Sequence, residues 1–276
     1  MPHPFFIAPR PLVFAHRGGS ALAPENTLAA FDRGLASGAD GLELDVRLSR
    51  DGVVVVHHDQ TLERTTNLHG AVADRTAGEL AAADAGYWFR PLDAGADGPA
   101  EANYPFRGAG HGVPTLAAVL GRYPDARVIV ELKGDSEALA RATVDVVRRA
   151  DASDRVCVGG FRSGVLRAVR RVAPDLATSA SREQVRWALY RSWVGWPAAR
   201  PAYAGYQVPE RAGHTRVVSR RFVERAHARD LGVQVWTVDG EEQAARLLRW
   251  GVDGLITDRP DVIVPFVRRM TTEARR

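Results

Sequence analysis

The sequence predicts a (β/α)8 TIM barrel, a closed ring of eight parallel strands surrounded by helices. Short runs rich in β-branched and apolar residues alternate along the chain with longer stretches of helical periodicity, a pattern typical of βα units in a parallel sheet. The chain has 276 residues, and one such barrel commonly occupies about 250. We therefore expect a single domain over residues 1–276.

Eight runs have the composition of barrel strands, at residues 12–16, 41–46, 128–132, 156–159, 176–179, 203–208, 234–238 and 254–257. Helices are predicted between them, at residues 27–36, 136–150, 164–172, 182–193, 220–230 and 241–250. Eight parallel strands with crossover helices close into a barrel more readily than they form an open sheet.

Residues 53–57 form a further strand that does not fit this ring. They follow the second strand through Asp51-Gly52, a tight turn, whereas parallel strands need a crossover of about a dozen residues or more. We expect an antiparallel strand beside the extension of strand two. A turn centred on Asp51-Gly52 sets residue 58 opposite residue 45 and brings His58 close to Asp45.

Residues 60–113 contain no barrel strand and include a stretch rich in Gly, Ala and Pro at 93–112. Such a long segment inside a compact domain is usually functional. We expect an inserted subdomain that forms a lid or rim on the barrel mouth.

Composition argues against several classes of protein. The net charge is +4 and the pI about 9.6, but the arginine pairs are scattered and resemble solvated helix faces, so no nucleic-acid partner is expected. No apolar run approaches the roughly 20 residues of a membrane span, and the first eleven residues lack the features of a secretory signal. The expected location is the cytoplasm. The lone cysteine, Cys157, is expected to be a small buried hydrophobe.

Three carboxylates are predicted to converge on the barrel mouth. Side chains alternate along a strand, so Glu43 and Asp45 share one face, as do Glu131 and Lys133. Both pairs fall at carboxyl ends of strands, where barrel active sites lie. Because clustered carboxylates repel one another, we expect Glu43, Asp45 and Glu131 to hold a hard divalent cation, Ca²⁺ or Mg²⁺, rather than zinc. Carboxylates on a solvent-facing strand are the simpler alternative.

Lys133 is the only lysine among 37 basic residues counted as Lys and Arg. A compact ammonium fits a tight pocket that a planar guanidinium does not. Lys133 is therefore a candidate functional residue, although codon bias could leave one lysine by chance.

Two histidines end predicted strands, His16 and His58. A pair of imidazoles suits the general base and general acid of a hydrolytic reaction. Arg17 offers a planar fork for phosphate oxygens. Alternation points His57 away from His58, toward packing or solvent.

An ordered set of motifs spans residues 13–260. It comprises His16-Arg17-Gly18, Pro24-Glu25-Asn26-Thr27, Glu43-Leu44-Asp45-Val46, His58-Asp59, Glu131-Leu132-Lys133, Val235-Trp236-Thr237-Val238 and Gly251-Val252-Asp253-Gly254-Leu255-Ile256-Thr257-Asp258. In this order the chain resembles the glycerophosphodiester phosphodiesterase family. The chain departs from the resemblance at Gly160-Phe161, where the family usually has Ser-Phe.

The resemblance implies a (β/α)8 barrel that hydrolyses glycerophosphodiesters to an alcohol and sn-glycerol 3-phosphate. It assigns acid–base catalysis to His16 and His58, metal ligation to the three carboxylates, and phosphate contacts to Arg17 and Lys133. Whether a hydroxyl of the substrate attacks first, giving a cyclic phosphate, is left open. Trp236 is either an apolar wall for the substrate or a core residue.

Two other functions remain open at this stage. Phospholipase D type enzymes acting on lysolipids or sphingolipids share the two-histidine, three-carboxylate layout. Such an activity would need an apolar rim at the mouth, which Tyr87-Trp88-Phe89 and Tyr104-Pro105-Phe106 could provide. A catalytically inactive binding protein is the second alternative, against which the complete set of catalytic residue types argues. The sequence predicts no oligomeric state.

Overall fold

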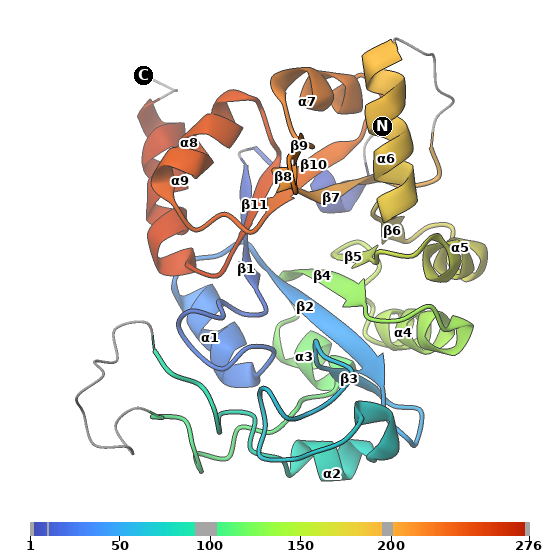
Figure 1. Ribbon diagram of the computed structural model, residues 1–276, viewed down its shortest axis with the longest axis vertical. Helices are drawn as coiled ribbons and strands as arrows, with labels where there is room; N and C mark the ends of the chain where they lie inside the picture. Colours follow the sequence, from blue (N-terminus) through green and yellow to red (C-terminus); the bar gives the residue numbers. More distant parts are fainter. Residues whose placement is uncertain (1–2, 10, 92–103, 195–200, 274–276) are drawn as a thin grey trace.

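The protein is a parallel barrel wrapped by helices (Figure 1). The computed structural model describes residues 3–9, 11–91, 104–194 and 201–273. Across these residues, eight parallel strands pair in the order β6-β5-β4-β2-β1-β11-β10-β7. A bridge between Ser179 and Gly205 joins the two ends of this order, and the Ala180 N–H donates to the Gly205 carbonyl at 2.9 Å. The predicted barrel is confirmed.

The barrel strands are β1 (Leu12–His16), β2 (Gly41–Leu48), β4 (Arg127–Leu132), β5 (Val156–Gly159), β6 (Ala177–Thr178), β7 (Gly205–Pro209), β10 (Gly232–Trp236) and β11 (Gly254–Thr257). Three short strands lie outside the ring: β3 (Val54–Val56), β8 (Arg211–Ala212) and β9 (Thr215–Arg216).

The helices are α1 (Leu28–Ala36), α2 (Ala77–Ala81), α3 (Leu116–Arg122), α4 (Glu137–Arg149), α5 (Ser163–Val172), α6 (Arg182–Val194), α7 (Arg220–His227), α8 (Glu241–Arg249) and α9 (Pro260–Glu273), with short 3₁₀ turns η1 (Pro4–Phe6) and η2 (Val72–Asp74). In the described part of the chain, no helix has the length and apolarity that crossing a membrane requires.

Side-chain caps set the starts of several helices. The Thr27 hydroxyl accepts from the Ala30 N–H before α1, and the Ser136 hydroxyl accepts from the Leu139 N–H before α4. Each satisfies an N–H group that has no partner inside the helix. The predicted helix starts near residues 27 and 136 follow from these caps.

The predicted starts of two strands are wrong by two residues. The structure begins β10 at Gly232, two residues before the prediction, and begins β7 at Gly205, two residues after it. At both strand starts a glycine makes room for a buried ring. A Cβ atom at Gly205 or Gly232 would lie 2.6 or 2.3 Å from the ring of Phe6.

The predicted hairpin register is wrong by one residue. Val46 pairs with Val56, and Leu48 pairs with Val54, so residue 57 rather than residue 58 lies opposite Asp45. The His57 N–H accordingly donates to the Asp45 carbonyl at 2.9 Å. The connection spans residues 49–53 and centres on Asp51 instead of lying between Asp51 and Gly52.

Inward-facing side chains fill the half of the barrel at which the strands begin. Phe14 of β1, Ile129 of β4 and Cys157 of β5 pack in one buried cluster. Phe5 and Phe6 of η1 close this cluster from the amino-terminal end, with Phe5 stacked on Phe14 at a centroid separation of 5.8 Å. Cys157 is the buried hydrophobe that was predicted.

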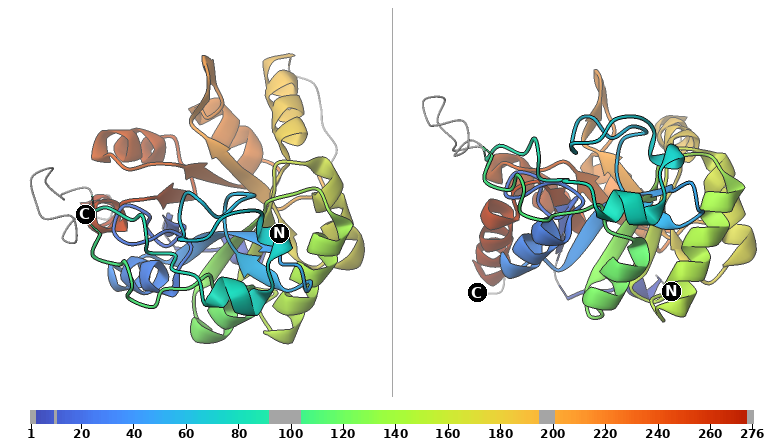
Figure 2. Two further views of the ribbon diagram at one scale, coloured as in Figure 1. Left: turned by 60° about the horizontal axis from the view of Figure 1, so that its bottom comes forward. Right: turned by 90° about the horizontal axis from the view of Figure 1, so that it is seen from below.

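The segment after β3 and the β8–β9 hairpin lie at the same end of the barrel, opposite η1 (Figure 2). In the described residues the segment packs on a small core of its own, made by Val55, Leu62, Val72, Leu80 and Val113. Both segments therefore lie at the end of the barrel at which the strands finish.

Removing the aromatic plug should cost stability. We expect Phe5→Ala to lower the free energy of unfolding by about 3–5 kcal/mol, because the side chain is fully buried and leaves a cavity. Denaturant unfolding checks this value. Ile7→Ala is the matched control, since Ile7 is 55% exposed two residues away and should change the value by about 0.5 kcal/mol or less. Similar losses in both variants would contradict the plug.

Candidate active site

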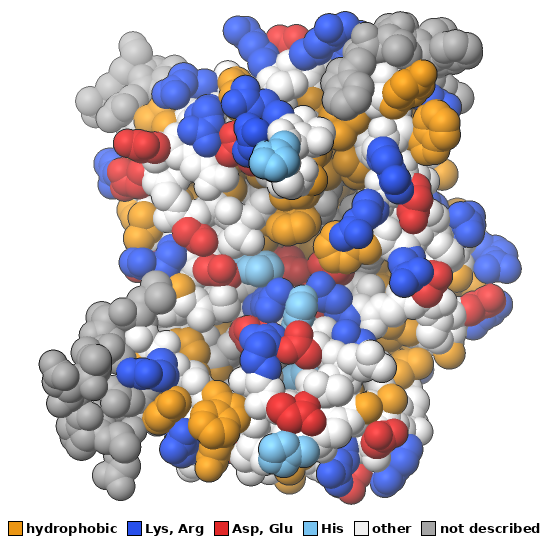
Figure 3. Space-filling model, in the orientation of Figure 1, with side chains coloured by type: hydrophobic (Ala, Val, Ile, Leu, Met, Phe, Trp, Pro, Cys, Tyr) orange, Lys and Arg blue, Asp and Glu red, His pale blue; other side chains and the backbone are white. Residues whose placement is uncertain are grey.

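A cavity of about 680 Å³ opens where the barrel strands end. Its lining includes His16 from β1, Glu43 from β2, Glu131 from β4 and Trp236 from β10. On this face of the molecule, acidic, basic and histidine side chains gather at the centre, with hydrophobic side chains beside them (Figure 3). The structure thus brings residues far apart in the sequence to one mouth.

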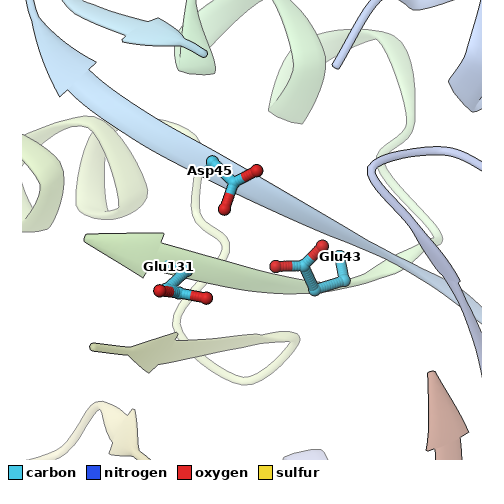
Figure 4. Close-up of side chains that lie close together, drawn as sticks. All are labelled: Glu43, Asp45 and Glu131. Carbon is cyan, nitrogen blue, oxygen red and sulfur yellow. The ribbon is translucent and has the colours of Figure 1, made fainter. Parts of the chain in front are cut away.

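The three predicted carboxylates converge (Figure 4). Glu43 and Asp45 come from β2 and Glu131 from the neighbouring strand β4, where Asp45 and Glu131 are register partners. One oxygen of each lies within 4.8 Å of the others. Glu43 is 4% exposed and Asp45 1% exposed, so the alternative of solvent-facing carboxylates is excluded.

Two cations balance this cluster. The Lys133 ammonium lies 2.7 Å from Glu131 Oε1 and 3.0 Å from Asp45 Oδ1. Arg17 Nε lies 3.2 Å from Asp45 Oδ2. Both contacts to Asp45 are ion pairs without hydrogen-bond geometry. Asp45 Oδ1 and Arg17 Nε are buried, and neither atom has a hydrogen-bond partner. Lys133 therefore lies among the carboxylates, as its place on the same strand face predicted.

The pKa values of the carboxylates differ according to their neighbours. Burial, and then repulsion by Asp45, raise the pKa of Glu43 to about 7. Burial disfavours charge on Asp45 as well, but Lys133 and Arg17 hold its pKa below its usual range. A buried carboxylate whose pKa is raised by a neighbouring carboxylate is stabilised in its charged form by a bound cation.

The carboxylates fit a divalent cation. Calcium takes oxygen ligands at about 2.3–2.6 Å, so oxygens on opposite sides of one ion are up to about 5 Å apart. The observed limit of 4.8 Å lies within that span. Asp45 Oδ1, whose contact is the ion pair with Lys133 at 3.0 Å, offers a ligand atom once that ammonium moves.

His16 is held from both sides of its ring. Nδ1 lies 2.6 Å from Asp258 Oδ1, and Nε2 lies 3.8 Å from Glu43 Oε2. The Ser20 hydroxyl donates to the same Asp258 oxygen. Burial alone would lower the pKa of His16, but the charge of Glu43, the hydrogen bond with Asp258 and the charge of Asp258 raise it to about 9.

His58 is held by a chain of ion pairs. Its Nδ1 lies 2.6 Å from Asp59 Oδ1, and Asp59 pairs with Arg64. Arg64 donates to both oxygens of Glu25 at 2.8 Å, and Glu25 also accepts from Arg17 at 2.9 Å. This network links the histidine to the predicted phosphate contact.

Sequence reasoning missed the role of Arg64 in this network. Arg64 belongs to the segment expected to form a rim, and its position six residues after His58 carries no periodic signal. Glu25 and Asp258 appeared only as members of motifs. Their pairing with Arg64 and His16 depends on contacts between distant parts of the chain.

Trp236 lies between the cavity and the core. It lines the cavity and packs against the buried cluster inside the barrel. Its ring lies 6.1 Å from that of Phe161 in an edge-on arrangement. Two aromatic rings from β10 and from the loop after β5 therefore form one wall.

The aromatic residues of the inserted segment do not line this cavity, as far as the chain is described. Arg107 lies over the rings of Tyr87 and Tyr104, at 4.2 and 4.0 Å from their centroids. Phe89 and Phe106 pack edge-on at 5.3 Å. These contacts bind the two aromatic runs to each other.

Comparison with known proteins places these features in one group. The model of the glycerophosphoryl diester phosphodiesterase family matches residues 16–262. A glycerophosphodiester phosphodiesterase of Caldanaerobacter subterraneus subsp. tengcongensis is 32% identical over 94% of this chain and 98% of its own.

Two solved structures share the fold. A glycerophosphoryl diester phosphodiesterase domain from Mycobacterium tuberculosis superposes with a TM-score of 0.80 at 24% identity, covering 94% of this chain and 99% of that one. A phosphodiesterase of Oleispira antarctica, in complex with the product sn-glycerol-3-phosphate, gives 0.74 at 26% identity and covers 94% and 97%.

His57 is structural in this geometry. It is buried, and its Nε2 lies 3.1 Å from the Thr61 carbonyl. Burial lowers its pKa more than neighbouring groups raise it. The unfolded chain takes up this proton near pH 6.5, before the folded chain does, so the free energy of unfolding should fall as pH drops below about 6.5.

We expect His57→Gln, which keeps a donor for Thr61, to lose that part of the pH dependence. Denaturant unfolding at pH 7.5 and 5.5 measures the difference for parent and variant. An equal difference in both proteins would show that His57 does not titrate as its burial requires.

Proposed function

The chain belongs to the glycerophosphoryl diester phosphodiesterase family, and we propose that it performs this activity by metal-dependent acid–base catalysis with two histidines. It is a glycerophosphodiester phosphodiesterase, an enzyme that hydrolyses a phosphodiester. The observation that carries the mechanism is the convergence of three carboxylates, two of them buried, beside a cavity that two held histidines line.

The proposed metal ligands are Glu43, Asp45 and Glu131. Oxygen donors select Ca²⁺ or Mg²⁺ over softer metals, and the spread of the oxygens is compatible with calcium. When bound, such a cation acts as a Lewis acid that neutralises charge on phosphate oxygens. It would also remove the repulsion that raises the pKa of Glu43.

Arg17 and Lys133 are the proposed phosphate contacts. Both line the cavity beside the carboxylates, and the guanidinium of Arg17 is fixed by Glu25. The phosphate of the substrate would compete with Asp45 for both cations. Trp236 and Phe161 offer an apolar wall for the carbon skeleton of the substrate.

His16 and His58 are the proposed acid and base. One imidazole removes a proton from the attacking oxygen nucleophile, and the other gives a proton to the leaving alkoxide as its P–O bond breaks. Asp258 and Asp59 each hold one ring through Nδ1, leaving Nε2 for the reaction. If water is the nucleophile, its oxygen bonds to phosphorus in this step; if a glycerol hydroxyl attacks, a cyclic phosphate forms and water opens it in a second step. Either route gives an alcohol and sn-glycerol 3-phosphate.

The alternatives receive less support. A phospholipase D type activity on lysolipids calls for an apolar rim at the mouth, but the described aromatic residues of the inserted segment pack on each other and on Arg107. An inactive binding protein would have no need for two histidines each paired with a carboxylate.

Chelation should abolish turnover. We expect protein treated with chelator to lose hydrolysis of a glycerophosphodiester, and Ca²⁺ or Mg²⁺ to restore it, because the carboxylate cluster needs a cation. An enzyme-coupled assay for glycerol 3-phosphate measures the rate. Asp32, a carboxylate outside the cavity that pairs with Arg122, gives the matched control, since Asp32→Asn should keep the response while Asp45→Asn loses it. Full activity in metal-free protein would contradict the three-carboxylate mechanism.

Lys133→Arg should fail almost as badly as Lys133→Ala. The ammonium already lies within 3.0 Å of Asp45 and Glu131, and a guanidinium there can hold both carboxylates by paired hydrogen bonds and compete with the metal. We expect lower kcat together with weaker metal affinity, measured by steady-state kinetics and metal titration. Parental turnover at unchanged metal dependence would make the single lysine an accident of codon usage.

A further inference from the structure

The cavity is larger than the catalytic cluster needs. Its volume of about 680 Å³ is in the range of sites that enclose a whole small ligand. Beyond the carboxylates and histidines it continues along β7, the β8–β9 hairpin and the start of α6. This second half, called here the outer chamber, is lined by Arg182, Val185, Pro209, Arg211 and Val217.

The charged side chains of the outer chamber are both basic. Arg182 opens α6 and Arg211 lies on β8, and both side chains are exposed. The acidic residues among the described cavity lining are Glu43 and Glu131, which belong to the carboxylate cluster. The outer chamber therefore presents positive charge without a compensating carboxylate in its described wall.

Arg182 is placed by contacts with the aromatic wall. Its backbone N–H donates to the Phe161 carbonyl at 3.1 Å, and its guanidinium lies 4.9 Å from the centroid of the Phe161 ring. The Lys133 ammonium lies 5.4 Å from the same centroid. A proposed phosphate contact and the guanidinium of the outer chamber thus lie beside the same aromatic ring.

Arg211 is held along the hairpin. Its guanidinium donates to the His214 carbonyl at 3.0 Å, which uses one of the five N–H donors of an arginine. In the described residues, neither Arg182 nor Arg211 forms an ion pair with a carboxylate. Both retain donors that a bound anion could accept from.

We propose that Arg182 and Arg211 form a subsite for an anionic group on the leaving alcohol. This inference rests on the proposed function and names its substrate class: glycerophosphodiesters whose alcohol carries a carboxylate or a further phosphate. Planar guanidinium forks bind both groups by paired hydrogen bonds. The phosphodiester would lie at Lys133 and the second anion at Arg182, both beside the Phe161 ring.

The same contacts disfavour a cationic alcohol such as choline. Quaternary ammonium groups bind aromatic faces, but the Phe161 ring already lies beside two cations of the protein itself. A third positive charge would be repelled.

A matched pair of substrates tests the subsite. Glycerophosphoinositol and its 4-phosphate differ only in one phosphate on the alcohol, and glycerophosphocholine supplies a cationic alcohol. We expect kcat/KM to be about 10-fold higher for the 4-phosphate than for glycerophosphoinositol, as charge-assisted hydrogen bonds at a solvent-accessible site allow. Glycerophosphocholine should be the poorest of the three.

The variants are compared by the ratio of kcat/KM for glycerophosphoinositol 4-phosphate to kcat/KM for glycerophosphoinositol. Arg182→Ala and Arg211→Ala should each reduce the ratio, and the double variant should bring it near one. Arg186→Ala is the control, because Arg186 is an exposed arginine one turn along α6 that does not line the cavity; its ratio should equal that of the parent.

Equal kcat/KM for the two inositol substrates, a preference for glycerophosphocholine, or a ratio unchanged by Arg182→Ala and Arg211→Ala would overturn the subsite while leaving the phosphodiesterase mechanism intact. Failure to hydrolyse any of the three substrates with metal present would contradict the proposed function instead. Calorimetric binding of glycerophosphoinositol 4-phosphate then still decides the subsite: we expect weaker binding to the double variant, and equal binding would overturn it.

Discussion

The site depends on one constraint, the clustering of three carboxylates, two of them buried, within 4.8 Å of one another. Without a metal ion, burial and mutual repulsion raise the pKa of Glu43 to about 7 and also raise the pKa of Glu131, and Lys133 and Arg17 supply the nearest positive charge. Burial keeps these charges away from water, where they would be screened, so they act strongly on any ion or phosphate that enters. The features that distinguish this end of the barrel therefore follow from a need for positive charge.

The histidines extend the same electrostatic arrangement. Asp258 holds His16 and Asp59 holds His58, so each imidazole has a carboxylate on one nitrogen. Arg64 and Glu25 tie Asp59 to Arg17. A disturbance of the inserted segment at Arg64 would thus reach the proposed phosphate contact. The segment therefore takes part in the site, although none of its described residues lines the cavity.

Local periodicity explains how much could be predicted. Two-residue alternation on β2 and β4 correctly placed Glu43, Asp45, Glu131 and Lys133 on one face, because a strand buried in a barrel has only two faces. The predicted hairpin register was wrong by one residue because the connection is five residues long, and the alternation of side chains does not reveal the length of a connection. Glycines that admit Phe6, and ion pairs such as His16 with Asp258, depend on contacts across about two hundred residues or more, which local patterns do not encode.

The central claim is that these carboxylates hold a divalent cation, and a crystal structure grown with Ca²⁺ tests it most directly. The account predicts one ion about 2.3–2.6 Å from an oxygen of each of Glu43, Asp45 and Glu131, with the Lys133 ammonium displaced from the position it shares with Asp45 and Glu131. A structure in which calcium binds elsewhere, or in which Lys133 still bridges the two carboxylates at saturating calcium, would contradict it.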